Sequence, residues 1–280
     1  MSRITINQAL SIGQKNLAPI TANYKNEVLW LMQKCLNINS VQLLLNSTTQ
    51  ELSSEEMQQF NQLIKRRTSK EPLQHILGSI EFYGYHFHIN KDVFIPRPET
   101  EIFVDILKSN LSIQNKALEI GAGAGCMSIL LELEHLANQI LSIDSNPQAI
   151  ALAQSNAQRL GCTKINFCVN DLFYMQHASK YDLIISNPPY ISLEEIDDLD
   201  VEVLLYDPLN ALTDYGDGLS FYQYFAKNGR DLLNSQGAML FEFGGRHQSQ
   251  KIQQLFSHSG YQYKIFNDLN NDPRFILIRL

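Results

Sequence analysis

The sequence of 280 residues has few cysteines and no long apolar run. Its four cysteines form no CxxC pair, which argues against a disulfide framework and a zinc knuckle: Cys35, Cys126, Cys162 and Cys168. His86 and His88 would share one face of a strand but lack a third ligand, so we expect no metal site. No run approaches the roughly 20 apolar residues of a membrane helix, and the start shows no secretory signal. We therefore expect a cytoplasmic protein without membrane attachment, and a monomer.

Basic residues are outnumbered by acidic ones, and the formal net charge is −7. Because lysine and arginine drive non-specific binding to a phosphate backbone, this charge disfavours DNA as a partner. Residues 1–75 carry eight Lys/Arg and five Asp/Glu, a net of +3, which leaves −10 on the remainder. This mildly basic part is a candidate surface for a protein partner, although Lys65-Arg66-Arg67 is typical of a solvated helix end.

The chain divides into a small N-terminal helical domain, a hairpin and a larger domain. Up to residue 75 the apolar residues repeat at helical spacing, as behind the capping box of Ser53 and Glu56. Pro72 ends this pattern, and the alternation within residues 79–94 predicts a β-hairpin. We predict a helical bundle at 1–75, a hairpin linker at 76–95 and a catalytic domain at 96–280.

Strand-like and helical runs alternate through the larger domain, which predicts an α/β fold with a doubly wound, mostly parallel sheet. The expected strands are 116–120, 139–143, 165–169, 181–186, 238–243, 261–266 and 274–280. The expected helices are 126–136, 147–160, 219–232 and 248–259. The last two strands are expected to form an antiparallel hairpin, an arrangement that resembles the S-adenosylmethionine-dependent methyltransferase fold.

A glycine-rich turn follows the first of these strands, in the run Leu118-Glu119-Ile120-Gly121-Ala122-Gly123-Ala124-Gly125. Glycines let the backbone approach a ligand closely at the carboxyl edge of such a sheet. A structural turn or a dinucleotide site would show similar glycines. Gly121, Gly123 and Gly125 fit the GxGxG spacing common in methyltransferases, whereas a dinucleotide fingerprint needs a small residue at the position of Cys126. The turn is therefore a candidate cofactor site.

Two acidic residues extend this candidate site. Asp144 ends the next strand, where a carboxylate can accept hydrogen bonds from both ribose hydroxyls; its alternative role is to cap the helix beginning at Pro147. Asp171 follows the third strand and can bind the adenine amino group while Leu172 packs on the ring. Aspartate is also a common turn former, so this position alone says little.

The apolar strand 181–186 runs directly into Asn187-Pro188-Pro189-Tyr190. The two prolines stiffen the turn, so the Asn187 side chain and the Pro188 carbonyl can act as a fixed pair of hydrogen-bond acceptors. Such a pair suits a planar amide or amino nitrogen, a poor nucleophile, because it stabilises the positive charge that develops during methyl transfer. Tyr190 can pack against the planar group. The residues leave open whether that group is an amide or a nucleic-acid base.

Further motifs make the chain resemble the release-factor glutamine methyltransferases, also called the HemK family, over nearly its whole length. They are Gln74–Gly78, Glu81-Phe82, Phe94–Glu101, Tyr206-Asp207-Pro208, Ala211-Leu212 and Gly218-Leu219. The Ile-Pro-Arg-Pro-Glu-Thr-Glu run is the most discriminating. Its prolines and glutamates suit a helix start, and its Arg97 is a candidate to pair with a carboxylate of the cofactor pocket.

The resemblance implies methylation of the N5 nitrogen of the glutamine in the Gly-Gly-Gln motif of peptide-chain release factors. S-adenosylmethionine would be the donor and S-adenosylhomocysteine the product. Asn187 to Tyr190 would bind the glutamine; Gly121 to Gly125, Asp144, Leu172 and Asn187 would line the cofactor site; and the N-terminal domain would contact the release factor. The chain departs from the family pattern at Leu172, where an aromatic residue is frequent, and at His247, which takes a usual glutamine position and is followed by Gln248.

Two other enzymes remain as alternatives. A sister enzyme that methylates a ribosomal-protein glutamine would share the catalytic residues and differ mainly in its N-terminal domain. An adenine-N6 DNA methyltransferase also uses this tetrapeptide, on a base flipped out of the helix. The acidic catalytic domain disfavours the DNA enzyme.

Overall fold

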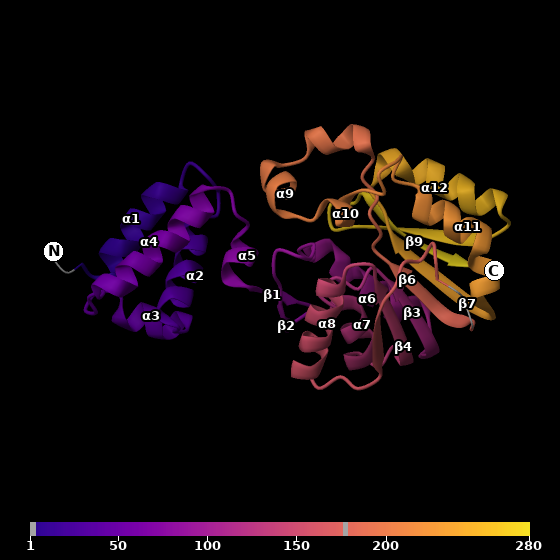
Figure 1. The fold of residues 1–280 in the computed structure, drawn as a ribbon, viewed down its shortest axis with the longest axis horizontal. Helices are drawn as coiled ribbons and strands as arrows, with labels where there is room; N and C mark the ends of the chain where they lie inside the picture. Colours follow the sequence, from indigo (N-terminus) through magenta and orange to yellow (C-terminus); the bar gives the residue numbers. More distant parts are fainter. Residues whose placement is uncertain (1–3, 176–178) are drawn as a thin grey trace. The chain divides into compact units, whose positions relative to one another are not determined.

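The computed structural model of the protein describes residues 4–175 and 179–280 (Figure 1). Contacts divide the chain into two compact units. The helical unit comprises the residues up to Ser79 together with Asp200–Tyr206, and the catalytic unit comprises Ile80–Leu199 and Asp207–Leu280. Most of the expected linker hairpin thus belongs to the catalytic unit. No helix in the described ranges has the length and apolar character needed to cross a bilayer.

The described residues of the helical unit, from 4 onward, form six helices. They are α1 (Ile6–Leu17), α2 (Tyr24–Leu36), α3 (Ser40–Asn46), α4 (Ser54–Thr68), α5 (Leu73–Leu77) and α9 (Val201–Tyr206). The predicted capping box begins α4: the Ser53 hydroxyl accepts from the Glu56 amide, and the Glu56 carboxylate accepts from the Ser53 amide. The buried faces of α1, α2 and α4 form a separate hydrophobic core.

Arg67, near the end of α4, is buried rather than solvated as we expected. Its guanidinium pairs with Glu27 of α2 at 2.6 Å and with Glu202 of α9 at 2.8 Å. The Tyr206 hydroxyl also donates to the Ser69 carbonyl at 3.1 Å. These contacts explain why a short segment from the second half of the chain belongs to the helical unit.

The catalytic unit contains a two-stranded hairpin, β1 (Ser79–Phe82) with β2 (Tyr85–His88), and a seven-stranded sheet of order β5-β4-β3-β6-β7-β9-β8. The sheet strands are β3 (Gln114–Ile120), β4 (Ala137–Asp144), β5 (Ile165–Val169), β6 (Tyr181–Ser186), β7 (Leu233–Glu242), β8 (Gln262–Asn267) and β9 (Pro273–Arg279). Strands β3 to β7 are parallel, and β9 is antiparallel to both β7 and β8. The predicted fold class is confirmed.

The sheet lies between two layers of helices (Figure 1). The helices are α6 (Ile102–Asn110), α7 (Cys126–Leu133), α8 (Pro147–Arg159), α11 (Ser220–Leu232) and α12 (Arg246–His258). Alternate residues of one strand join different cores: Leu183 and Ile185 pack with α6, α7 and α8, whereas Ile184 packs with α11 and α12. A parallel sheet covered on both faces reads as a continuous apolar run, as 183–185 does.

The segment after Tyr190, for which we predicted neither a helix nor a strand, contains short helices. These are η2 (Leu193–Asp198), α9 and α10 (Leu209–Leu212); a further turn, η1 (Pro98–Glu101), precedes α6. Elements of four to six residues are too short to show a helical repeat in the sequence. One of them, η2, nevertheless begins with a local signal, the capping box of Ser192 and Glu195.

Candidate active site

The glycine turn and the Asn-Pro-Pro-Tyr run meet because of the strand register. Strands β3 and β6 are neighbours, and Ile120 pairs with Ser186. The residues that follow, Gly121 and Asn187, therefore leave the sheet side by side, and a Cβ on Gly121 would lie 3.9 Å from the Asn187 carbonyl oxygen. The strand order reverses between β3 and β6, which is where open α/β sheets bind ligands.

A cavity of about 360 Å³ opens at this edge of the sheet, within the range of about 300 to 1,000 Å³ common for small-molecule sites. Its lining contains all but one of the predicted site residues: Gly121, Ala122, Gly123, Ala124, Asp144, Asp171, Leu172, Asn187, Pro188, Pro189 and Tyr190. One hollow thus joins the candidate cofactor and substrate residues.

Gly125 is the predicted residue that does not line this cavity. It is the N-terminal cap of α7, with a φ of +82°. A Cβ at this position would lie 2.9 Å from the Cβ of Ala153 in α8. The glycine therefore allows two helices to pack closely. Gly123 differs, because its φ is +52° and no atom lies within 4 Å of the position a Cβ would take. Gly123, unlike Gly125, lines the cavity.

Asp144 holds the glycine turn in place. Its carboxylate accepts from the Gly123 amide and from the Asn146 amide, both at 2.9 Å. Burial raises the pKa of Asp144, and these two hydrogen bonds oppose that rise. The helix cap that we considered for Asp144 belongs instead to Asn146, whose side chain accepts from the Gln148 amide. Each carboxylate oxygen has two lone pairs, so Asp144 keeps acceptor capacity for a ligand.

Asp171 and Leu172 lie in a tight turn after β5. The Asp171 carboxylate accepts from the Phe173 amide at 2.9 Å, so the turn-forming role is present. Leu172 is buried and lines the cavity. Phe173, the next residue, also lines it and makes an edge-on contact with Phe221 at 5.0 Å between ring centroids. An aromatic ring is thus present beside the position where the sequence departs from the family pattern.

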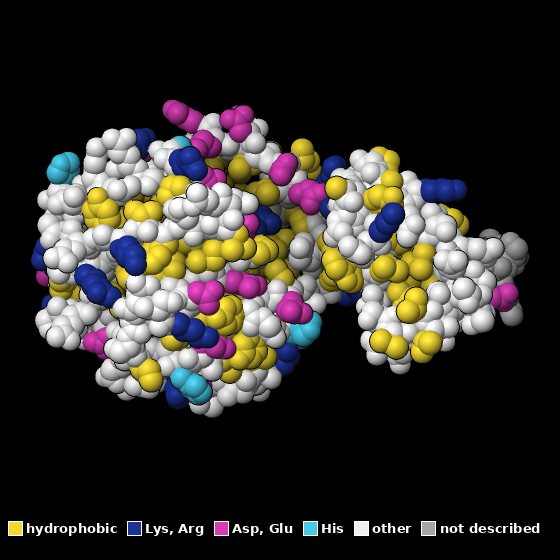
Figure 2. All heavy atoms as spheres, turned by 180° about the vertical axis from the view of Figure 1, so that it is seen from behind, with side chains coloured by type: hydrophobic (Ala, Val, Ile, Leu, Met, Phe, Trp, Pro, Cys, Tyr) yellow, Lys and Arg dark blue, Asp and Glu magenta, His cyan; other side chains and the backbone are white. Residues whose placement is uncertain are grey.

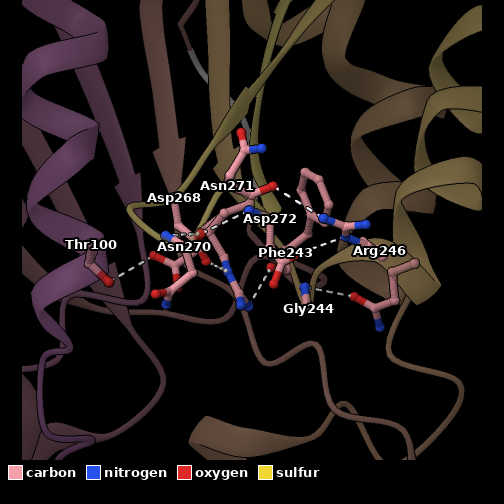
Figure 3. A network of polar contacts seen from close by, with 11 residues as sticks. Thr100, Phe243, Gly244, Arg246, Asp268, Asn270, Asn271 and Asp272 are labelled. Carbon is pink, nitrogen blue, oxygen red and sulfur yellow. Dashed lines mark hydrogen bonds and ion pairs between the residues drawn. The ribbon is translucent and has the colours of Figure 1, made fainter.

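The backbone of the Asn187–Tyr190 run is fixed at both ends. The Ser186 hydroxyl donates to the Ile120 carbonyl at 2.8 Å, which ties β6 to β3. At the other end the Tyr190 carbonyl accepts from the side-chain amide of Gln248, whose oxygen accepts from the Gly244 amide (Figure 3). Gln248 therefore connects the start of α12 to this turn.

The second departure from the family pattern is explained by these contacts. Gln248 is buried and reaches the turn, whereas His247 is exposed and pairs with Glu195 at 3.1 Å. The glutamine one position later thus supplies a side-chain amide to the Tyr190 carbonyl.

Tyr190 packs into an enclosed, charged surrounding. Burial raises the pKa of its phenol well above the ordinary value, and the nearby Glu242 carboxylate acts in the same direction. Arg274 opposes this rise through a hydrogen bond and its charge. The phenol is therefore neutral and serves as a packing and hydrogen-bonding group.

Arg97 pairs with a carboxylate, as we considered, but not with one that lines the cavity. Its partner is Asp207 at 2.9 Å, and its guanidinium lies 4.8 Å from the centroid of the Phe94 ring. Pro208, next to Asp207, does line the cavity. The pair thus joins the Pro-Arg-Pro run to the Tyr-Asp-Pro motif at the border of the site.

Sequence reasoning missed several residues at the site. Phe94, Pro96 and Thr100 line the cavity, although they precede the sheet in the chain. Glu119 lines it as well, is buried, and accepts from the Ser142 hydroxyl at 2.6 Å. A charged residue between the apolar Leu118 and Ile120, at the end of the strand, was the available signal for Glu119, because ionisable groups are almost never fully buried unless they are paired.

Burial raises the pKa of Glu119 to about 7, and hydrogen bonds from Ser142 and Ser128 oppose that rise. The charge of Asp144 acts in the same direction as burial. Two carboxyl groups thus flank the glycine turn, and burial favours the protonated form of each.

Comparisons with known proteins agree with this arrangement. The model of the methyltransferase small domain matches residues 96–244, and that of the PrmC N-terminal domain matches residues 8–78. A methyltransferase structure from Pyrococcus furiosus superposes with a TM-score of 0.53 at 18% identity, covering 70% of this chain and 88% of that one. This likeness concerns the fold alone.

Two relatives align with most of this chain over most of their own length. The release factor glutamine methyltransferase of Geobacter sulfurreducens is 35% identical, over 85% of this chain and 83% of its own length. That of Bacillus subtilis is 32% identical, over 83% of this chain and 84% of its own. The chain therefore belongs to the release factor glutamine methyltransferase family.

Proposed function

We propose that the protein, acting as a monomer and not on DNA, transfers a methyl group from S-adenosylmethionine to the N5 nitrogen of the Gly-Gly-Gln glutamine of release factors. One observation carries the proposal: the register of β3 and β6 brings Asn187 beside Gly121 in one cavity. Donor and acceptor residues for a methyl transfer thereby share a single enclosed space. Family membership favours a release factor over a ribosomal protein as the substrate.

Asn187 and Pro188 bind the substrate nitrogen in this proposal. The Asn187 side-chain oxygen and the Pro188 carbonyl accept hydrogen bonds from the two N–H groups of the substrate amide. These bonds orient the nitrogen lone pair toward the methyl donor and stabilise the developing positive charge. Tyr190 and Pro189 exclude water and pack against the planar amide. The chain's contribution to the rate is then mainly positioning, and the nitrogen loses a proton after transfer.

The cavity fits the proposed donor. Asp144 accepts the ribose hydroxyls, Leu172 packs on the adenine, and Asp171 receives the amino group. The open position at Gly123 leaves room for the backbone to approach the ligand. Bound S-adenosylmethionine supplies an electrophilic methyl group on a sulfonium, leaving S-adenosylhomocysteine. The acidic lining complements that positive charge.

The helical unit is the proposed contact for the release factor. Large apolar side chains are exposed on it: Ile12, Trp30, Val41, Leu44 and Leu45. Figure 2 shows hydrophobic and basic side chains on the surface of this unit. Exposed apolar groups beside basic ones are typical of a protein-binding surface, and the surplus of basic residues in 1–75 fits an acidic partner surface.

Methylation of a recombinant release factor tests the function. The purified protein, incubated with methyl-labelled S-adenosylmethionine, should label wild-type release factor and not a variant whose Gly-Gly-Gln glutamine is replaced. Label that appears only in ribosomal protein or DNA offered in parallel would contradict the proposal.

A substitution tests the site. Asn187→Ala removes one acceptor for the substrate nitrogen, and loss of one such transition-state hydrogen bond costs on the order of a hundredfold or more in kcat. Circular dichroism and thermal unfolding of the variant serve as the control for folding. Turnover near the wild-type rate would show that the glutamine binds elsewhere.

A further inference from the structure

Glu242 is a buried acid whose place beside the site is set by strand register. In the parallel pair of β6 and β7, Ser186 lies opposite Phe241. The next residues, Asn187 and Glu242, therefore also lie next to one another, one past the last paired position. Glu242 is 2% exposed and is not part of the cavity lining. It is therefore a neighbour of Asn187 that does not itself line the cavity.

Two hydrogen bonds hold Glu242, and a third side chain acts on its charge. The Thr100 hydroxyl donates to its carboxylate at 2.7 Å (Figure 3). The Tyr222 hydroxyl donates to its main-chain carbonyl at 2.6 Å. The Asn187 side chain, adjacent through the strand register, lowers the pKa of its carboxyl group and so favours the charged form. The glutamate therefore accepts from a cavity-lining threonine and lies next to the proposed substrate-binding asparagine.

The charges around this carboxyl group favour a functional role over a purely structural one. Arg274 on β9 favours its charged form, Glu99 on η1 disfavours it, and Tyr190 and Tyr222 lie close enough to be affected by its charge. Within residues 4–175 and 179–280, no ion pair to Glu242 is formed at 4 Å or less. Burying a carboxylate without a direct ion pair lowers the stability of the folded state, and an apolar residue at this position would avoid that penalty.

We propose that Glu242, held by Thr100, is a positioning residue that fixes the orientation of the Asn187 side-chain amide. An asparagine amide has a donor end and an acceptor end, and only the acceptor end can bind the hydrogens of the substrate nitrogen. Glu242 takes the donor end, which turns the oxygen toward the cavity. This inference rests on the proposed function, and it gives the Pro-Glu-Thr-Glu run a role through Thr100.

The arrangement also strengthens Asn187 as an acceptor. A hydrogen bond from its NH₂ group to a carboxylate polarises the amide and increases the negative charge on its oxygen, since bonded groups in a chain polarise one another. A protonated Glu242 would do the reverse, because its hydroxyl could donate to the Asn187 oxygen. Glu242 exchanges no proton with the substrate in this scheme; only its charged form supports the productive orientation.

Kinetics of Glu242→Gln provide the first test. The neutral side chain can pair with either end of Asn187, so we expect kcat to fall about tenfold to a hundredfold, with KM for the release factor and affinity for S-adenosylmethionine unchanged. Thr100→Val should lower kcat less, in the same way. The matched control is Glu132→Gln, a buried glutamate that accepts two backbone amides at 2.8 Å away from the cavity. It should retain the wild-type kcat.

A double-mutant cycle separates positioning from general damage. If Glu242 acts through Asn187, then Glu242→Gln added to Asn187→Ala should cause no further loss of kcat. A full additional loss in the double variant, or wild-type kcat in Glu242→Gln, overturns the proposal while leaving the proposed function intact. An inactive wild-type protein would instead refute the proposed function.

The third measurement needs no substrate. Burial raises the pKa of Glu242 to about 7, so the charged form is lost as the pH falls below that value. The side-chain ¹⁵N–¹H resonance of Asn187, assigned by its absence in Asn187→Ala, should shift through this pH range in the wild type and stay constant in Glu242→Gln. The kcat profile should lose its acidic limb in the same variant. An Asn187 resonance that ignores Glu242 would refute the contact itself.

Discussion

Gly218 offers a quantitative test of how tightly the turn at Asn187–Tyr190 is held. Its φ is +74°, and a Cβ at this position would lie 2.8 Å from the Tyr190 carbonyl carbon, closer still to its oxygen, and 2.9 Å from the Gln248 amide nitrogen. Ordinary contacts of a Cβ begin at 3.4 Å. In Gly218→Ala, the backbone at Tyr190 must therefore move away.

The displacement should reach the reacting groups. Tyr190 lies three residues after Asn187 in a run stiffened by two prolines, so a shift on the order of 1 Å at its carbonyl would misplace the substrate acceptors, and such a misplacement costs about a hundredfold in rate. Alanine at positive φ also costs roughly 1–2 kcal/mol of stability. Both effects are expected in Gly218→Ala.

Gly161→Ala separates the two effects. Gly161 has nearly the same φ, +77°, is exposed, and has no atom within 4 Å of the position its Cβ would take. This variant should lose similar stability and keep the wild-type kcat. Steady-state methylation and thermal unfolding of the two variants give the comparison, with circular dichroism to confirm folding. Equal kcat values for folded Gly218→Ala and Gly161→Ala would refute the reasoning.

Two further predictions concern buried charges. Arg67→Met leaves Glu27 buried without its partner at 2.6 Å, so the free energy of unfolding in urea should fall by about 3–5 kcal/mol; an unchanged value would mean that water reaches Glu27. Glu119 has a pKa raised from 4.5 to about 7. The folded state therefore binds the Glu119 proton more tightly than the unfolded state does. This protonation contributes its whole stabilising free energy below pH 4.5, and the contribution is lost as the pH rises to about 7. Glu119→Gln should flatten this decline in pH-dependent thermal unfolding, and an identical decline in the variant would assign it to other groups.

The elements that the sequence predicted best are those whose own residues carry the pattern. The strands 165–169 and 181–186 have the predicted bounds, because apolar runs of this kind can be recognised without knowledge of their neighbours. The meeting of the glycine turn with Asn187 was also predictable, since both follow parallel strands at the same edge of the sheet.

The residues that the sequence did not reveal depend on pairings between distant segments. Glu242 lies beside Asn187 only because Ser186 is opposite Phe241 in the sheet, and no local pattern fixes that register. Gly125 resembles its neighbours Gly121 and Gly123 in the sequence, but the position of Ala153 makes it a packing residue. Arg67 looked like part of a solvated basic cluster because its partner Glu202 is 135 positions away.

The membership of Asp200–Tyr206 in the helical unit has a consequence for modular engineering. The chain crosses between the units three times, after Ser79, after Leu199 and after Tyr206, instead of once. A fragment that ends at Ser79 lacks Glu202, one of the two carboxylates that pair with Arg67. A chimera that exchanges substrate-recognition modules between relatives must therefore transplant two separate pieces of sequence, the N-terminal helices and residues 200–206. Arg67 and Glu202 then come from the same protein and can form their ion pair.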